Sequence, residues 1–225
     1  DLGRLMAKIR TIEALDDLLS EETAWRMQEL TTARKLVQQS EGTVKVAALR
    51  SGILILYAHW EGWIKNASRL YIRYVNSQKY SLNELSSAFL GNAIKTRISA
   101  CADATQSSTH NEFALFIQQN LNDRVALSED LVRTESNLSS SVLEDILSRL
   151  GLPILNVYQS RAHLIDEKMV SRRNSVAHGK YLQLEQEEFL DLHSDILELL
   201  QTFTDQIRNA ASTNAHLLQK QPSTR

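Results

Sequence analysis

The sequence predicts an all-α protein, a helical bundle built on two long helices with shorter helices packed around them. Only 2 prolines and 7 glycines occur among 225 residues, and both residue types break or weaken helix interiors. Apolar residues recur at helical spacing along two long stretches. In three places a Ser or Thr is followed three residues later by Glu, which is the pattern of a helix-opening capping box.

The two long helices are expected at about 44–78 and 184–211. The first contains no proline, and only the isolated Gly52 and Gly62 weaken its helical pattern. The apolar side of the second is formed by Leu190, Leu192, Ile196, Leu199, Leu200 and Phe203. Because neither stretch keeps a strict seven-residue period, a plain coiled-coil adaptor is the least favoured interpretation.

Two helices are expected before the first long one. Apolar residues at helical spacing predict a helix over 3–18. Ser20 is a suitable N-cap for a second helix reaching about Gln39, and Gly42-Thr43 marks the first clear break.

The three capping boxes predict shorter helices between the long ones. They begin at Ser81, Thr109 and Ser141, and predict helices that run towards Ala102, over 113–121 and up to Gly151. The polar stretch 122–140 is expected to be a mobile loop or a segment that faces nucleic acid. A further helix is expected from about Gln159 to Ala177, with Gly179 as its stop.

Length and charge limit the organisation and the class of function. The chain suits one domain over 1–218, with N-terminal helices in 1–41, a core in 44–211 and a frayed tail in 219–225. A formal charge of −2 means that any contact with nucleic acid should be a local patch. The most apolar run, 46–58, is too short to span a bilayer, so no membrane partner is expected.

No cofactor and no metal site are predicted. The single Cys101 gives neither a disulfide framework nor a zinc cluster, and the chain lacks a signal-like start, so a cytoplasmic location is expected. No pair of histidines has metal-ligand spacing, and the sequence contains no Gly-rich phosphate loop. His59, in an aromatic-rich helix, is expected to be a packed core residue.

The chemically richest segment is Arg172-Arg173-Asn174-Ser175-Val176-Ala177-His178-Gly179. A helix C-terminus stabilises positive charge, and Asn174 lies four residues before His178, where it can orient the imidazole. On a continuous helix Arg173 and His178 would point roughly 140° apart, so they converge only if the helix ends by Ala177. Spacing alone favours a simpler interpretation, a helix C-terminus finished with basic residues.

A second candidate lies in the first long helix. Glu61 and Lys65 are four residues apart, which is the spacing of an exposed salt bridge. The functional alternative is that both face the segment around Arg173. The neighbouring aromatic residues are expected to be core or a dimer seam, with stacking on bases as the alternative; they are Trp60, Trp63, Tyr71 and Tyr74.

The run Arg173-Asn174-x-x-Ala177-His178-Gly179 resembles the Arg-x4-6-His signature of the HEPN superfamily. That superfamily consists of small helical bundles, many of them metal-independent endoribonucleases in toxin–antitoxin, abortive-infection and CRISPR systems. Its motif lies near the end of a late helix and precedes another long helix, as here. The segment around Glu61 and Lys65 is similar to one in the early long helix of several branches. Where some members have Tyr two residues after the motif His, this chain has Lys180, so that role is not transferred.

The resemblance, which covers about 44–210, implies cleavage of RNA by attack of the ribose 2′-OH on the neighbouring phosphate. His178 would be the general acid or base, Arg173 would hold the phosphate, and Asn174 would orient His178. The supporting or RNA-binding residues would be Glu61, Lys65, Arg172 and Lys180. It also implies a homodimer with a composite active site and allows an antitoxin or effector partner. The alternative is a catalytically silent HEPN-like module for dimerisation or partner binding.

Overall fold

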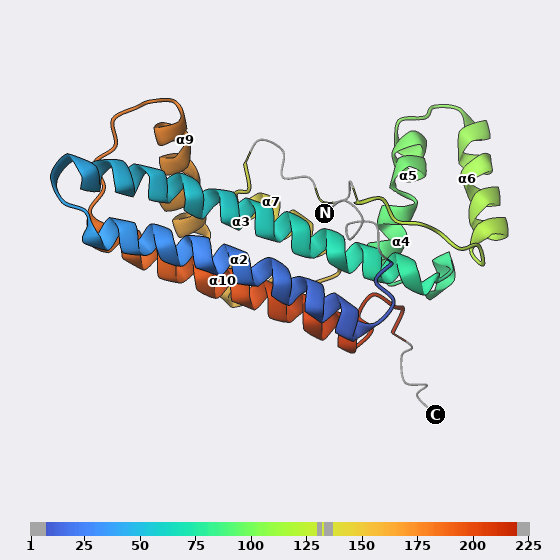
Figure 1. Ribbon diagram of the computed structural model, residues 1–225. Helices are drawn as coiled ribbons and strands as arrows, with labels where there is room; N and C mark the ends of the chain where they lie inside the picture. The colour runs from blue at the N-terminus through green and yellow to red at the C-terminus, as the bar shows by residue number, and fades with distance from the viewer. Residues whose placement is uncertain (1–7, 130–131, 133–136, 220–225) are drawn as a thin grey trace.

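The computed structural model describes residues 8–129, 132 and 137–219. All of the regular elements in this part of the chain are helices, which confirms the all-α class. Three long helices lie side by side: α2 (Ile12–Gln39), α3 (Gly42–Gln78) and α10 (Gln186–Ser212) (Figure 1). The two predicted long helices are therefore α3 and α10, and α2 joins them as a third.

The predicted break at Ser20 is wrong, because α2 runs through it without interruption. The helix begins after Thr11, whose hydroxyl oxygen accepts a hydrogen bond from the Ala14 amide at 3.1 Å. Leu15, Leu19 and a series of later residues form one buried stripe on both sides of Ser20, so packing favours a single helix. Of the helix expected over 3–18, residues 3–7 lie outside the described residues, and residues 8–11 are not helical.

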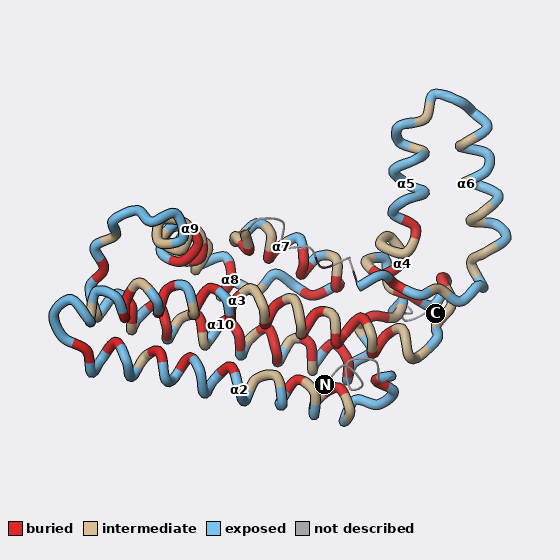
Figure 2. Tube along the Cα trace, turned by 45° about the horizontal axis from the view of Figure 1, so that its top comes forward, coloured by how far each residue is buried: buried red, intermediate tan, exposed pale blue. Residues whose placement is uncertain are grey.

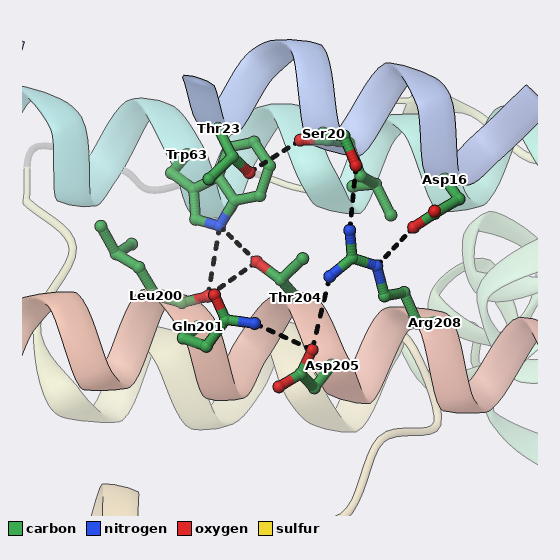
Figure 3. A network of polar contacts seen from close by, with 10 residues as sticks. Asp16, Ser20, Thr23, Trp63, Leu200, Gln201, Thr204, Asp205 and Arg208 are labelled. Atoms are coloured by element: carbon green, nitrogen blue, oxygen red, sulfur yellow. Dashed lines mark hydrogen bonds and ion pairs between the residues drawn. The ribbon is translucent and has the colours of Figure 1, made fainter. Parts of the chain in front are cut away.

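The large aromatic side chains of α3 form the centre of the bundle. Trp60 and Tyr71 are fully buried, and Trp63 is 2% exposed. The Trp63 indole donates a hydrogen bond to the Thr204 hydroxyl of α10 at 3.0 Å. Beside it, Arg208 reaches from α10 to Asp16 and Ser20 of α2 (Figure 3). The core interpretation of these aromatic residues is therefore confirmed.

Shorter helices cover one side and one end of this bundle. They are η1 (Leu82–Glu84), α4 (Ser87–Ala93), α5 (Lys95–Ala102), α6 (Ser107–Asn120), α7 (Ser140–Arg149) and α8 (Asn156–Ser160). In Figure 2, α5 and α6 form a hairpin that projects from the end of the body, and neither helix contains a buried residue.

Of the three predicted capping boxes, the one at Ser81 is present, and the other two helices begin at residues near the predicted ones. The box at Ser81 is present, but it opens a single 3₁₀ turn, and α4 and α5 follow as separate helices. Thr109 lies inside α6 instead of capping it. The cap of α7 is Ser139, whose hydroxyl accepts from the Val142 amide, and not Ser141. Within 122–140, residues 130–131 and 133–136 lie outside the described part of the chain.

The helix predicted from Gln159 to Ala177 is instead interrupted. After α8, a π-helix η3 (Leu164–Ser171) leads directly into the short helix α9 (Arg172–Ala177). The buried residues of η3 are Ile165, Met169 and Val170. A π-helix bonds residues five apart, so side chains four and five apart can face the same side and pack together on the bundle.

Gly52 is required where α3 meets α10. A Cβ at this position would lie 2.7 Å from the ring of Phe189, which is itself fully buried. Gly52→Ala should therefore lower the free energy of unfolding by roughly 1–2 kcal/mol, because overpacking outweighs the gain in helix propensity. Gly91→Ala, in α4, is the matched control, since nothing lies within 4 Å of its Cβ. Urea denaturation should show opposite signs for the two variants; a stabilised Gly52→Ala would contradict this packing.

His216 makes stability depend on pH. It is fully buried among the rings of Tyr71, Tyr74, Tyr80 and Phe89, with ring centres 5.5–6.5 Å away. Burial lowers the pKa of His216 to about 4. The unfolded chain therefore binds a proton near pH 6.5 that the folded chain does not bind until about pH 4, so stability falls as pH falls through this window.

We expect this residue to account for about 2–3 kcal/mol of the stability lost between pH 7 and pH 4.5. Urea denaturation of wild type and His216→Phe at both pH values measures it. His59 and His193, whose pKa values are also lowered by burial, remain in the variant and serve as an internal reference. An equal loss of stability in both proteins would show that His216 is not the titrating group.

Candidate functional site

The end of α9 is built as a tight C-terminal cap. The Gly179 amide donates to the Val176 carbonyl at 3.1 Å, and the Lys180 amide donates to the Ser175 carbonyl at 2.9 Å. Gly179 has φ +68°, the left-handed conformation that this cap requires. The prediction that the helix ends at Ala177 with Gly179 as its stop is therefore confirmed. His178 occupies the cap position, and its side chain is exposed.

Arg173 is held on three sides. Its guanidinium carbon lies 4.2 Å from the ring centre of Tyr57 on α3, a cation–π contact. Its Nη1 donates to the side-chain oxygens of Asn137 at 2.9 Å and Asn174 at 2.7 Å. Among the described residues, both hydrogen bonds of this side chain use Nη1. Nε and Nη2 therefore have no partner in this part of the chain and can bind an anion.

Tyr57 connects Arg173 to Glu61. The Tyr57 hydroxyl accepts a hydrogen bond from the Leu138 amide at 2.9 Å and also bonds the Glu61 carboxylate. Burial is the main cause that raises the pKa of Tyr57; the charge of Glu61 acts in the same direction, and the Leu138 bond and Arg173 oppose it. Sequence reasoning did not single out Tyr57, although it lies one helical turn before Glu61 and so on the same face of α3.

Glu61 and Lys65 pair as their spacing predicts, with 2.7 Å between Oε1 and Nζ. Their side chains are 18% and 30% exposed, so the pair is partly buried rather than a free surface salt bridge. Glu61 also bonds Tyr57, whose ring packs on the Arg173 guanidinium, so Glu61 is connected to Arg173 through Tyr57. Lys65 is joined to this group of residues only through its ion pair with Glu61, among the described residues.

The two other predicted site residues, Arg172 and Lys180, make contacts with different helices. Arg172 donates from Nη2 to Glu188 of α10 at 3.1 Å, and this hydrogen bond is the main cause that lowers the pKa of Glu188. Arg172 therefore anchors α9 to α10. Lys180 is exposed, and its carbonyl oxygen accepts a hydrogen bond from Arg50 at 2.9 Å.

The predicted orientation of His178 by Asn174 is not what the chain shows. The Asn174 side-chain oxygen accepts from Arg173, because the guanidinium is adjacent and charged. Among the described residues, no hydrogen bond joins the side chains of Asn174 and His178, and none joins Arg173 to His178. In a single chain, then, the arginine is positioned and the imidazole is left open to solvent.

Three further features bear on the sequence-based expectations: the burial of His59, possible metal ligands and possible membrane-spanning helices. His59 is buried and contacts Glu29 at 2.9 Å, so its core interpretation is confirmed. Within the described ranges, no three His, Cys, Asp or Glu side chains are grouped as they would be around a metal ion. Nor does any helix of those ranges have the length and apolar character needed to cross a bilayer.

The bundle carries an Arg-Asn-x-x-Ala-His segment at the end of a late helix, directly before its last long helix, which is the arrangement that the resemblance to the HEPN superfamily predicts. A family model described as MAE_28990-like HEPN matches residues 15–215. The chain belongs to this HEPN family. The match spans the region predicted from the resemblance and adds most of α2. Comparison with curated proteins and with solved structures gave no match.

Proposed function

We propose that the chain is an endoribonuclease that cleaves RNA by 2′-OH transesterification without a metal ion, in a phage-defence or toxin–antitoxin setting. The observation that carries this proposal is the state of Arg173. It is fixed by Tyr57, Asn137 and Asn174, while Nε and Nη2 have no partner among the described residues. A guanidinium preorganised in this way, five residues from an exposed imidazole, suits the binding of a phosphate beside a proton-transfer group.

The reaction needs one proton taken and one proton given. A base removes the proton of the ribose 2′-OH, and the 2′ oxygen attacks the adjacent phosphorus. The bond from phosphorus to the 5′ oxygen breaks, and an acid protonates that leaving oxygen. The products are a 2′,3′-cyclic phosphate and a 5′-OH. His178 is proposed for these proton transfers, because imidazole exchanges protons near neutral pH. Arg173 is proposed to stabilise the charge on the phosphate oxygens.

A second copy of the chain would complete the site. Among the described residues of one chain, no hydrogen bond joins Arg173 to His178, and the imidazole is exposed. Packing two protomers about a two-fold axis would place both pairs in one cleft. It would also gather Lys65 and Lys180 from both copies, concentrating positive charge in a protein whose overall charge is −2. An antitoxin or effector would then act by covering or opening that cleft.

The direct test is to incubate the purified protein with single-stranded and structured RNA in the presence of EDTA. The expected result is cleavage that leaves 2′,3′-cyclic phosphate and 5′-OH ends, identified by end-specific labelling. Cleavage only after addition of a divalent ion, or products with 5′-phosphate, would contradict the proposed chemistry. Absence of any cleavage by the dimer would favour a binding module instead.

A further inference from the structure

An open cleft of about 350 Å³ lies beside the end of α9. One wall is the beginning of α3, with Lys45 and Arg50; the other is the segment 181–186, which joins α9 to α10. Arg50 donates from Nη1 to the Lys180 carbonyl at 2.9 Å. This hydrogen bond joins the α3 wall of the cleft to a residue that lies two positions after His178. Its size and position fit one unit of a ligand whose next unit lies at His178.

The charged groups of this cleft favour a phosphate on the α3 side. Lys45 is half-buried in the wall, and its ammonium has no ion pair among the described residues. Arg50 uses Nη1 for the Lys180 carbonyl and presents the rest of its guanidinium. Glu185 also lines the cleft, directly before α10, so the cleft is not uniformly basic. This mixture suits a ligand that carries one anionic group beside hydroxyl or amino groups.

Tyr181 supplies a flat apolar surface in the same cleft. Tyr181 is 86% exposed, which is unusual for an aromatic residue in a folded protein. Exposed aromatic rings next to basic groups are stacking platforms for unpaired bases. Gln186 also lines the cleft, and its side-chain oxygen is buried with no hydrogen-bond partner in the described part of the chain. That oxygen can accept a hydrogen bond from a base amino group or a ribose hydroxyl.

We propose that this cleft binds the nucleotide that flanks the scissile phosphate of a single-stranded RNA. Its base stacks on Tyr181, and its phosphate is held by Lys45 and Arg50. The inference rests on the proposed function, because that function places the scissile phosphate at Arg173 and His178. A paired base is already stacked within its duplex, so a nucleotide in this cleft must come from an unpaired region.

The test measures binding of a fluorescein-labelled, mixed-sequence RNA 12-mer by anisotropy, with His178→Ala as the common background to prevent cutting. Tyr181→Ala should weaken binding roughly 5-fold or more, and Tyr181→Phe should restore it, because phenylalanine keeps the stacking surface. Lys45→Ala should also weaken binding and should reduce the slope of log K against log salt by about 0.7, the value for one phosphate contact on a single strand. Lys95→Ala, on the projecting α5, is the matched control and should change neither quantity.

The outcomes separate this inference from the proposed function. If wild type cuts RNA and the KM for cutting is the same in Tyr181→Ala and Lys45→Ala, the cleft assignment is wrong while the nuclease assignment stands. If wild type does not cut, but the 12-mer binds with the predicted dependence on Tyr181 and Lys45, the cleft stands without the nuclease. Equal binding of a blunt RNA duplex, with the same dependence on both residues, would overturn the assignment to single strands.

Discussion

His178→Ala is expected to lower the rate of RNA cleavage about 100- to 10,000-fold, the usual contribution of a general acid or base. The side chain is exposed at the cap of α9, and the cap itself is formed by backbone bonds of Gly179 and Lys180. Replacing the imidazole should therefore leave the fold intact. Thermal denaturation and the rate of cleavage, measured on the same sample, check both statements.

Arg173→Ala should cause a loss of similar size for a different reason. The guanidinium is proposed to hold the phosphate, and its removal also leaves the oxygens of Asn137 and Asn174 without this donor. Arg173→Lys keeps the charge but cannot make the same set of hydrogen bonds, so only part of the rate should return. Lys95→Ala, remote on α5, is the control for a loss of charge. Cleavage that persists in both His178→Ala and Arg173→Ala would show that the site is elsewhere.

The same variants distinguish a nuclease from a silent module in cells. An active ribonuclease should slow growth when overexpressed alone, and growth should recover with His178→Ala. A toxic effect that is unchanged in this variant would point to binding rather than cleavage.

Trp60→Ala should be among the most destabilising single changes in the chain, lowering the free energy of unfolding by about 3–5 kcal/mol. Trp60 is fully buried in α3, and its indole donates a hydrogen bond to the Leu138 carbonyl at 3.2 Å. The change thus removes a large apolar group and also leaves that carbonyl without its partner. Urea denaturation monitored by circular dichroism measures the loss.

Trp60→Phe is the matched control, because it retains most of the apolar volume and loses the indole N–H. Its cost should be clearly smaller than that of Trp60→Ala. The Leu138 amide donates to the Tyr57 hydroxyl, so losing the anchor at the neighbouring carbonyl should also loosen the support of Arg173. We therefore expect Trp60→Phe to reduce cleavage more than its small effect on stability would suggest. Equal stability of the Ala and Phe variants would contradict the packing described here.

The fold class and the two predicted long helices were accessible from sequence because their signals are local. Helical spacing over 44–78 and 184–211 agrees with α3 (Gly42–Gln78) and α10 (Gln186–Ser212) within about two residues. The stop at Gly179 was also predictable, since a left-handed cap favours glycine. The break at Ser20 was wrong because a good cap residue does not end a helix whose buried stripe continues on both sides of it.

The residues that hold Arg173 in place could not be predicted from local sequence signals. Asn137 and Tyr57 reach Arg173 from segments 36 and 116 residues away, and no local pattern relates them. The partners of the two adjacent arginines could not be predicted either: Arg172 pairs with Glu188 of α10, while Arg173 contacts Tyr57 of α3. Neighbouring residues of a helix point about 100° apart, so Arg173 faces α3, on which α9 packs, while Arg172 reaches Glu188 of α10.

By itself, the sequence determined that this chain is helical, where α3, α9 and α10 end, and which residues form the Arg173–His178 segment. These features depend on spacing and on backbone preferences that act within a few residues. Only the tertiary structure decided that Arg173 is held by Tyr57 and Asn137, and that Asn174 serves Arg173 rather than His178. Such partners are chosen when distant helices pack, because a hydrogen bond or a cation–π contact depends on distance in space and not on distance along the chain.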